Sequence, residues 1–509
     1  MQNKYLLSID YGTQSVRALV FDQHGQLIAK AQRPVISYHS QKPHYAEQET
    51  EYCWQQVCDV VQALWRDSNL TPDQICGLSV TTQRNCVLHL DQNNRPLRPM
   101  FMWPDDRRAT YLPRLAWWWK VAFSFVGMNS RIGYFQGQSE INWVAQHQPD
   151  IATGAAKVGF LSSFINYKMT DNLIDSVASQ VGYLPFDYKR RRWCHALAWQ
   201  WQAIDVKPAQ MVDVIEPGEL IGSITAEAAK ATGLLEGTPL VAAGADKACE
   251  TLTANAASAN VASVSLGTAA TISITQRRYK EAFRYLPAYP ALTEASFINE
   301  IILQRGFWLF SHFIEQYGAE DRAQAKKLGI SVEQYICGQL PDIMPGSDGL
   351  TLQPFWSPGV IYPGPEAKGS ILGFTPAHTR LHLYRALIEG ILFALKQGLT
   401  RLKRIAPQPI KVIRISGGGS QSDVVMQMAA DIFNLPCERV QTYETSGLGA
   451  AIACAKGVGL YHSIAKGAKD MVKIGDRFEP SDDAKAYQQI YTEKAQPLYR
   501  YLKPFYKKY

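Results

Sequence analysis

Apolar and polar residues follow the same order in two stretches of the chain, and in each they predict a β-hairpin. The first stretch, Tyr5 to Asp22, is an apolar run, a Gly-Thr turn and a second run of alternating apolar residues. Val261 to Thr275 repeats this order around a second Gly-Thr turn. One such turn alone is usually structural, but these two lie half a chain length apart. They predict two related domains, with a boundary near residue 255.

Helix and strand patterns alternate between and after the hairpins, as in an α/β protein. Apolar residues recur at helical spacing over 51–67, where Thr50 is placed to cap the helix. Further β-rich runs and helical patterns follow, and the elements that they predict are strands at 75–82, 86–91, 411–416 and 437–441 and helices at 420–434 and 447–460.

The most hydrophobic stretch, Leu115 to Met128, contains Lys120 and is shorter than the roughly 20 apolar residues that a membrane span needs. We therefore expect a buried or interface helix. Consecutive helical side chains point about 100° apart, so part of the Trp117 to Trp119 triplet must contact another element, a lid or another subunit. Core packing is the expectation that we favour for this triplet.

Composition narrows the class of protein. With 509 residues, 46% of them hydrophobic and 19% charged, the chain can bury large cores and is not of a disordered type. A net charge of +7 over this length is too weak for a nucleic-acid binder. Its nine cysteines are scattered without a C-x-x-C pair, and the N-terminus lacks a signal-peptide pattern. We expect a cytoplasmic protein with neither nucleic acid nor membrane as partner.

Three glycine-bearing turns are candidates for holding phosphate. In Asp10 to Thr13 a carboxylate precedes a tight turn. The backbone N–H groups of the turn can bind a phosphate, and the carboxylate can bind the magnesium ion of that phosphate through water. The second hairpin has Ser265 in place of that carboxylate. Ser416 to Ser420 is a glycine-rich turn between a strand and a helix. A P-loop and a dinucleotide-binding fingerprint are both missing from the sequence.

Asp246 is the candidate general base. It follows the short strand pattern from Val241, with Lys247 beside it, and a carboxylate at the end of a strand can accept a proton from a substrate hydroxyl. A cap on the helix that begins near Ala248 is an equal alternative.

These motifs, in this order, resemble the FGGY carbohydrate kinases over essentially the whole chain. DYGTQSVR resembles the first phosphate loop of the family, SLGT the second, TTQRN and MWPDDRR the sugar-contacting segments, and GAD the element with the catalytic aspartate. GSILGFTPAHTRLHLYRALIEG is similar to the second family signature, departing mainly at Phe374, and SGGGSQS with ETSGLGAA is similar to the adenosine-binding elements.

The resemblance implies an α/β fold of two duplicated ribonuclease-H-like domains, as in actin-like ATPases, with an ATP and sugar cleft between them. It implies that residues 1–255 carry the sugar contacts, the first phosphate loop and the catalytic aspartate, and that residues 256–509 carry the second phosphate loop and the adenosine site. The residues carried over are Asp246 as catalytic base; Gln83, Arg84, Asn85, Trp103, Asp105, Arg107 and Lys247 for the sugar; Asp10, Gly12, Thr13, Gln14, Ser15, Arg17, Gly267, Thr268, Gly417, Gly418 and Ser422 for ATP; and Asp10 for Mg²⁺.

Several positions depart from the family pattern. In YFQGQSEINW, which resembles the first signature, Glu140 replaces the usual lysine and Gly137 the usual Pro, Ser or Thr. Asn85 stands where glycerol kinases carry Glu, and Lys247 replaces the Gln or Asn that follows the base. Neither the glycerol kinases nor the xylulose kinases fit cleanly.

The activity implied is ATP- and Mg²⁺-dependent phosphorylation of a hydroxyl of a small sugar or polyol, such as the ketopentoses xylulose or ribulose. Two alternatives stay open: an activity like that of glycerol kinase, and a non-catalytic sugar or ATP sensor on the same fold. The partner expected is a small-molecule sugar or polyol, and the sequence also leaves room for a homodimer.

Overall fold

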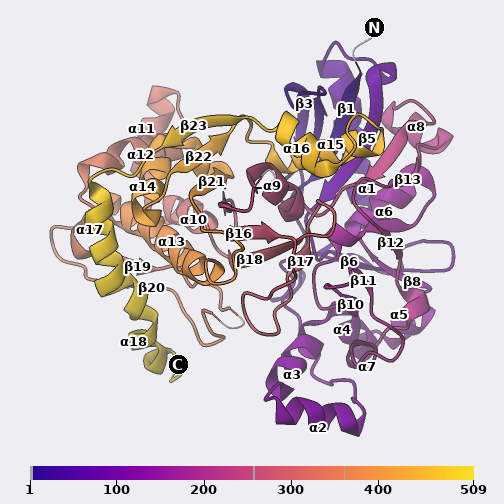
Figure 1. Ribbon diagram of the computed structural model, residues 1–509, viewed down its shortest axis with the longest axis horizontal. Helices are drawn as coiled ribbons and strands as arrows, with labels where there is room; N and C mark the ends of the chain where they lie inside the picture. Colours follow the sequence, from indigo (N-terminus) through magenta and orange to yellow (C-terminus); the bar gives the residue numbers. More distant parts are fainter. Residues whose placement is uncertain (1–3, 256–257, 360–361, 509) are drawn as a thin grey trace. The chain divides into compact units, whose positions relative to one another are not determined.

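The structure, a computed structural model, describes residues 4–255, 258–359 and 362–508 and has an α/β fold (Figure 1). It divides into two compact units. The first contains Met1–Thr253, Tyr289–Ser296 and Ser446–Val472, and the second contains Ala254–Ala288, Phe297–Thr445 and Lys473–Tyr509. The sequence-based boundary at residue 255 placed everything after it in one domain, whereas two later segments pack within the first unit.

The sheet of the first unit has the order β13-β14-β5-β1-β2-β3. β1, β2 and β3 are antiparallel, β5 and β14 run parallel to β1, and β13 closes the sheet antiparallel to β14. The bounds of these strands are β1 Tyr5–Tyr11, β2 Ser15–Phe21, β3 Leu27–Pro34, β5 Ile75–Thr82, β13 Leu220–Ser223 and β14 Pro239–Ala242.

Six neighbouring strands of the second sheet repeat this arrangement of directions in the order β18-β16-β15-β21-β22-β23. β15, β16 and β18 are antiparallel, β21 and β22 run parallel to β15, and β23 is antiparallel to β22. The bounds are β15 Val261–Leu266, β16 Ala270–Gln276, β18 Phe297–Leu303, β21 Val412–Ser416, β22 Cys437–Val440 and β23 Ile474–Phe478. The duplication that the two Gly-Thr hairpins predicted is therefore present in the topology.

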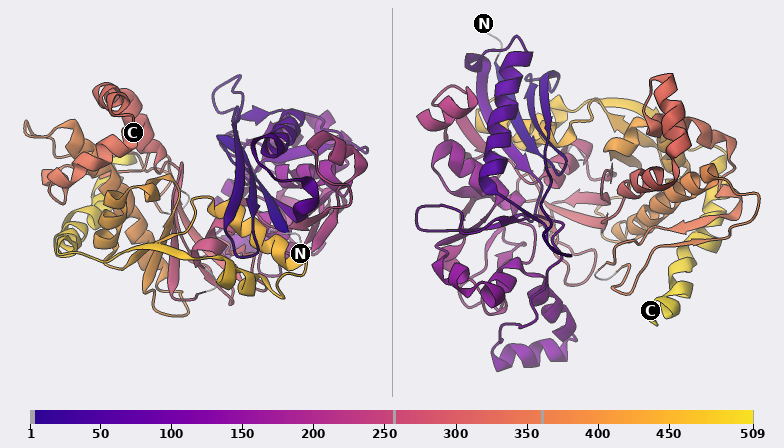
Figure 2. Two further views of the ribbon diagram at one scale, coloured as in Figure 1. Left: turned by 90° about the horizontal axis from the view of Figure 1, so that it is seen from above. Right: turned by 180° about the vertical axis from the view of Figure 1, so that it is seen from behind.

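Helices cover the sheets with their apolar sides. In the first unit α1 (Thr50–Asp67) lies along β2 and β3 (Figure 2), and it buries Cys53, Val57, Val61 and Leu64, which are spaced as on one helix face. The other main helices of this unit are α3 Asn129–Gln138, α4 Glu140–His147, α6 Leu161–Thr170, α8 Ala226–Thr232 and α16 Ile464–Met471. The second unit has α10 Trp308–Tyr317, α11 Ala319–Leu328, α12 Val332–Gln339, α13 Arg380–Leu402, α14 Asp423–Phe433, α17 Asp483–Ile490 and α18 Gln496–Tyr506.

Helix α15 (Thr445–Gly457) packs within the first unit, where its glycines lie close to other elements of that unit. A Cβ on Gly449 would lie 2.3 Å from the carbonyl oxygen of Cys249 in α9 (Asp246–Asn255), and one on Gly457 would lie 2.5 Å from the side chain of Val241 in β14. Only glycine allows this close approach. The GLG sequence was predicted to belong to an adenosine-binding element, and in this structure its Gly449 serves helix packing.

Two helix starts differ from the predictions. Thr50 is the first residue of α1, not its cap; Glu49 holds the N-cap position, and no side chain caps the helix there. The helix predicted from residue 420 begins at Asp423, because the glycine-rich turn first forms a short 3-10 segment at Gly418–Gln421. In both places the local turn decides the boundary.

The hydrophobic stretch after Leu115 forms α2 (Trp117–Phe125), and only its inner face is buried. Phe123 is 8% exposed and stacks on Trp119, whereas Trp117, Trp118 and Phe125 are exposed, Phe125 by 93%. Of the predicted buried or interface helix, the buried alternative is thus wrong for the outer face, and the interface alternative stays a prediction. Core packing holds for one tryptophan of the triplet, Trp119. Within the described ranges no helix combines the length and the apolar character that crossing a bilayer requires.

Candidate active site

Three loops of the first unit lie together because they follow the neighbouring parallel strands β1, β5 and β14. The hydroxyl of Thr81 donates to the carbonyl oxygen of Gly244 at 2.8 Å, which ties the loop before Asp246 to β5. Ligands of open α/β sheets bind outside the carboxyl ends of the strands. This edge of the sheet holds the Gly12-Thr13 turn, the Gln83–Asn85 segment and Asp246.

The first glycine turn is closed by a hydrogen bond from the Gly12 N–H to the carbonyl oxygen of Ser15 at 3.0 Å. Before the turn, Asp10 is buried in β1 and faces Arg17 in β2, with Nη1 and Oδ2 3.0 Å apart. Gln14 is exposed at the tip. The turn therefore presents a carboxylate whose charge is balanced within its own hairpin.

Thr13 connects the turn to the predicted sugar-contact segments. Its hydroxyl donates to Oε1 of Gln83 at 3.2 Å and accepts from Nε1 of Trp103 at 3.0 Å. Nε2 of Gln83 is buried and has no hydrogen-bond partner in the described part of the chain. Buried donors are normally satisfied, so this amide is available to a ligand or a water.

Asp246 is the first residue of α9, and its Oδ1 accepts from the backbone N–H of Lys247 at 2.7 Å. Burial raises the pKa of the Asp246 carboxyl above its usual range, and the charges of Lys247 and Arg84 act against this rise. Lys247 also forms an ion pair with Glu250 at 2.6 Å, and Arg84 lies 6.0 Å from the ring centre of Tyr289. A partly buried carboxylate flanked by two cations suits a general base.

Asp105 is enclosed more fully than a residue that contacts substrate needs to be. Its side chain is 1% exposed, and it accepts from the guanidinium of Arg107 at 2.6 to 3.0 Å and from the backbone N–H of Ala46 at 2.7 Å. Arg107 also pairs with Glu47 at 2.8 Å. The Arg107 guanidinium lies 4.0 to 4.4 Å from the ring centres of Tyr45, Phe101 and Trp143. In this structure the pair is buried and packs against these rings.

Asn85 lies next to a buried acid. It has a φ of 59°, and its Nδ2 donates to Oε1 of Glu140 at 2.9 Å. Gly182 lies directly against it, since a Cβ there would be 2.4 Å from Oδ1 of Asn85. The structure thus brings Glu140, a departure from the family signature, into contact with the predicted sugar segment.

In the second unit the Gly267 and Ser416–Ser420 turns are neighbours because β15 and β21 are adjacent and parallel. The carbonyl oxygens of Gly267 and Thr268 accept from Phe307 and Gly306, each at 2.9 Å. Gly417 has a φ of 85°, and a Cβ on it would lie 2.8 Å from the backbone of Leu266. Glycine is therefore required where the two turns meet.

The other two predicted nucleotide residues of this unit differ in their surroundings. A Cβ on Gly418 would meet nothing within 4 Å, so the backbone there faces open space. Ser422 is the N-cap of α14, where its hydroxyl accepts from the N–H of Val425 at 3.4 Å. Its position beside the start of a helix suits anion binding.

One further residue lies beside Arg84. Tyr289 belongs to the segment Tyr289–Ser296, which comes from the second half of the chain but packs in the first unit and contacts Arg84. No motif marks Tyr289. In the part of the chain that the structure describes, no group of three or more His, Cys, Asp or Glu side chains could hold a metal ion by itself.

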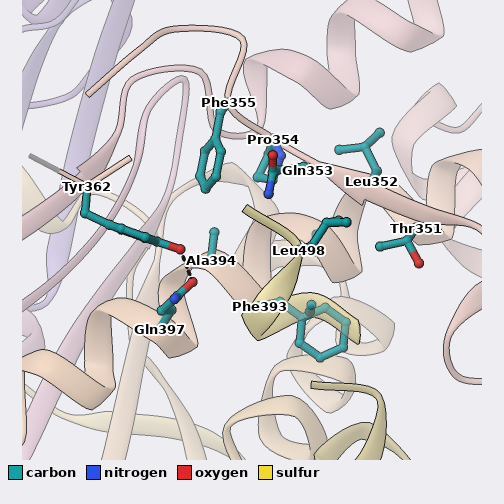
Figure 3. Close-up of a pocket in the computed structure, with 12 residues that line it drawn as sticks. Thr351, Leu352, Gln353, Pro354, Phe355, Tyr362, Phe393, Ala394, Gln397 and Leu498 are labelled. Carbon is teal, nitrogen blue, oxygen red and sulfur yellow. Dashed lines mark hydrogen bonds between the residues drawn. The ribbon is translucent and has the colours of Figure 1, made fainter. Parts of the chain in front are cut away.

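A cavity in the second unit is lined by none of these residues (Figure 3). It is lined from the segment around Phe355, from α13 and from α18, and Tyr362 donates to Gln397 beside it. None of its lining residues is charged. It offers no group for acid-base or phosphate chemistry.

Comparison with known proteins assigns the chain to a family. Residues 5–253 match the N-terminal domain, and residues 262–458 the C-terminal domain, of the FGGY family of carbohydrate kinases. The chain is 26% identical over 492 residues to the "Uncharacterized sugar kinase YgcE" of Escherichia coli, covering 96% of this chain and 92% of that protein. It is 26% identical to the xylulose kinase of Bacillus subtilis and 27% to the gluconokinase of Bacillus licheniformis, covering 96% of this chain and 95% and 94% of those proteins.

Solved structures show the same fold. The gluconate kinase and the ligand-bound xylulose kinase of Lactobacillus acidophilus each superpose with a TM-score of 0.82 over 99% of both chains, at 19% and 18% identity. The N-terminal family domain coincides with the first segment of the first unit, whereas the C-terminal family domain also includes Tyr289–Ser296 and part of Ser446–Val472, which pack in the first unit. The chain belongs to the FGGY family of carbohydrate kinases and is an ATP-dependent sugar kinase, a phosphotransferase with an alcohol group as acceptor.

Proposed function

We propose that the substrate is a small ketose or polyol, such as a ketopentose, and that Asp246 is the catalytic base. The observation that carries this proposal is the convergence of Asp246, Arg84 and the Gln83–Asn85 segment at one edge of the first sheet. The relatives include xylulose kinases and gluconokinases at similar identity, so the comparisons leave the sugar open.

Asp246 takes the proton of the substrate hydroxyl as that oxygen forms its bond to the γ-phosphorus of ATP. The bond from the γ-phosphorus to the β,γ-bridging oxygen breaks, and ADP leaves. Burial raises the pKa of Asp246, which makes its carboxylate a better proton acceptor, while the nearby charges of Lys247 and Arg84 act against that rise. The alternative role of Asp246 as a helix cap has less support. A capping side chain accepts from the backbone N–H of the second or third residue after it, whereas the Asp246 carboxylate accepts from that of the next residue, Lys247.

The glycine turns fit the phosphates of a nucleotide. Gly12 and Thr13 in the first unit, and Gly267, Thr268 and Gly417 in the second, form tight turns. A Cβ on Gly417 would lie 2.8 Å from the backbone of Leu266, and one on Gly12 would lie 3.3 Å from the carbonyl oxygen of Ser15. Gly418 adds open space beside Ser422 for the adenosine portion. We propose that the first unit contributes the sugar contacts and the base, and the second unit the adenosine site.

Mg²⁺ fits Asp10. Mg²⁺ usually keeps several water ligands and binds through one or two carboxylates plus substrate phosphates, so a single buried carboxylate at the phosphate turn is sufficient. Mg²⁺ would neutralise charge on the phosphates. Arg17, paired with Asp10, holds that carboxylate in place within the hairpin.

A coupled ADP-release screen tests the substrate. We expect Mg²⁺-dependent turnover with xylulose, ribulose or a polyol such as ribitol, and weaker turnover with glycerol. Turnover confined to sugar acids would show that the substrate class is wrong. Calorimetry with ATP and ADP in the presence of magnesium tests the turns separately, and failure to bind either nucleotide would contradict the nucleotide residues.

A further inference from the structure

Glu140 is one hydrogen bond away from the segment that carries Arg84. It is the first residue of α4, its side chain is buried at 7% exposure, and Oε1 accepts from Nδ2 of Asn85 at 2.9 Å. Asn85 directly follows Arg84, whose charge acts on Asp246. A change in the charge or hydrogen bonding of Glu140 is thus transmitted to the residues beside the base.

Several buried polar atoms of the Gln83–Asn85 segment and of the two residues before Glu140 have no hydrogen-bond partner in the described ranges. They are Oδ1 of Asn85, Nε2 of Gln138, Oγ of Ser139 and Nε2 of Gln83. Buried polar groups are nearly always satisfied, and a cluster of exceptions needs an explanation. The cluster includes an acceptor, two donors and a hydroxyl, which matches the mixed donor and acceptor pattern of sugar hydroxyls.

One carboxylate and one guanidinium exert opposing charges on Glu140. The charges of Asp105 and Arg107 affect the pKa of Glu140, and the charge of Glu140 in turn raises the pKa of Tyr183 and Cys86. Arg107 is already paired with Asp105 and Glu47. Burial, reinforced by Asp105, raises the pKa of Glu140 to about 7, against the hydrogen bond from Asn85 and the charge of Arg107. Near neutral pH the side chain is therefore present both as a carboxylic acid and as a carboxylate.

Building on the proposed function, we propose that Glu140 and Asn85 form a subsite for a hydroxyl of an uncharged sugar or polyol and that this subsite rejects sugar acids. A hydroxyl both donates and accepts, so it can bond to Asn85 and to either form of Glu140. A carboxylate placed there meets a like charge once Glu140 is ionised. Specificity then comes from a repulsive group as much as from attractive ones.

The test compares kcat/KM for xylulose and for gluconate in wild type, Glu140→Gln and Glu140→Lys between pH 6 and 8.5. In wild type we expect KM for gluconate to rise relative to KM for xylulose as the pH passes 7. Glu140→Gln keeps the acceptor for Asn85 and should abolish this rise. Glu140→Lys should shift the preference toward gluconate by about tenfold or more, since a like charge becomes an opposite one.

Asp175→Asn is the matched control. Asp175 is also buried, with its pKa raised to about 6, but it bonds to Ser162 and to the backbone of Ser176. This control should leave the xylulose-to-gluconate ratio and its pH dependence unchanged. Asp246 is the base for both sugars, so its titration should change kcat/KM for xylulose and for gluconate equally. A change in the xylulose-to-gluconate ratio of kcat/KM therefore reports on Glu140 and not on the base.

The outcomes distinguish this proposal from the proposed function. If neutral sugars are phosphorylated but the ratio is the same in Glu140→Gln and Glu140→Lys as in wild type, the function stands and the Glu140 subsite is wrong. If Glu140→Lys does not fold, the pH dependence of the KM for gluconate relative to that for xylulose in Glu140→Gln is enough to test the subsite. If wild type phosphorylates none of the sugars, the proposed function fails. Calorimetric binding of xylulose and gluconate to wild type and Glu140→Gln, which needs no turnover, then decides on the subsite.

Discussion

At the scale of single residues, the site depends on a few polar groups held in unusual surroundings. The sequence predicted Asp246, the Gly12 turn and the Gln83–Asn85 segment, because each belongs to a short motif at a strand end. It could not predict that Asp105 accepts from the backbone N–H of Ala46, or that Tyr289 lies against Arg84, because both contacts join segments far apart in the chain. Motifs mark local chemistry, and contacts made by folding decide how it is used.

Asp246→Asn should remove sugar phosphorylation while leaving the fold and ATP binding nearly intact. Positioned general bases contribute roughly 10² to 10⁴-fold in rate. Asn retains the acceptor for the Lys247 N–H, so α9 should be undisturbed. The measurements are kcat, the midpoint of thermal unfolding, and ATP affinity by calorimetry. A variant that keeps most of its turnover would reduce Asp246 to a structural residue.

Arg84→Ala should raise KM for the sugar far more than KM for ATP. Arg84 lies on the loop after β5, between Gln83 and Asn85, and its charge acts on Asp246. Loss of that charge should also raise the pKa of Asp246 further, so activity on the acidic side of the pH profile should fall. Equal KM values for sugar in the two proteins would remove this segment from the site.

Glu140→Gln should stabilise the protein at alkaline pH. A buried acid whose pKa is raised, here to about 7, contributes stability that is fully present below its unfolded pKa and lost as the pH rises through the folded pKa. The glutamine variant does not carry the charged form. Its melting temperature relative to wild type should therefore be higher at pH 8.5 than at pH 5. A difference that is the same at both pH values would contradict a raised pKa for Glu140.

At the scale of elements, helical and strand periodicity predicted the existence of α1, β5, β21 and α15, and local turns decided their ends. Periodicity could not separate the two faces of α2, because both are apolar: Phe123 packs inward and Phe125 is solvent-exposed. Nor could it assign α15 to the first unit, because the decisive feature is the fit of glycines against a distant helix and strand.

The two faces of α2 should respond differently to truncation. Phe123→Ala should lower the free energy of unfolding by about 3 to 5 kcal/mol, as for other buried phenylalanines. Phe125→Ser should change it by no more than about 0.5 kcal/mol, because the side chain is 93% exposed. Urea unfolding of the two variants provides the measurement. A large loss in Phe125→Ser would mean that the outer face is covered in solution.

Two helical glycines form a second matched pair. Gly449→Ala should destabilise the protein, since the new Cβ would lie 2.3 Å from the Cys249 carbonyl oxygen and α15 would have to shift. Gly338→Ala in α12 meets nothing within 4 Å and should be neutral or stabilising by up to about 1 kcal/mol, from helix propensity. Thermal unfolding compares them. Equal effects would show that α15 tolerates displacement.

At the scale of the whole molecule, two units with the same strand directions reflect the pair of Gly-Thr hairpins in the sequence. The repeat was visible because each hairpin is local. The sequence did not reveal that two later segments, Tyr289–Ser296 and Ser446–Val472, belong to the first unit. A single boundary in the sequence assumes that each unit is continuous. Residues 446–472 complete the first unit although they lie near the other end of the chain.

A fragment of residues 1–255 should therefore fail to fold stably. Without α15, the surfaces that receive Gly449 and Gly457, at Cys249 and Val241, are exposed. Circular dichroism during heating should show no cooperative transition for this fragment. A longer fragment with 446–472 joined by a flexible linker should recover one. Cooperative unfolding of 1–255 alone would show that α15 is dispensable.

The place of α15 in the first unit also bears on how the protein is made. Domains normally fold during synthesis in order from the N-terminus, as they leave the ribosome. Here the segment that completes the first unit, Ser446–Val472, emerges long after Met1–Thr253. At 5 to 20 residues per second, the first 253 residues wait about 10 to 45 s for it. During that time part of their apolar surface is open to chaperones, so the yield of folded protein should depend on the rate of translation between residues 253 and 472.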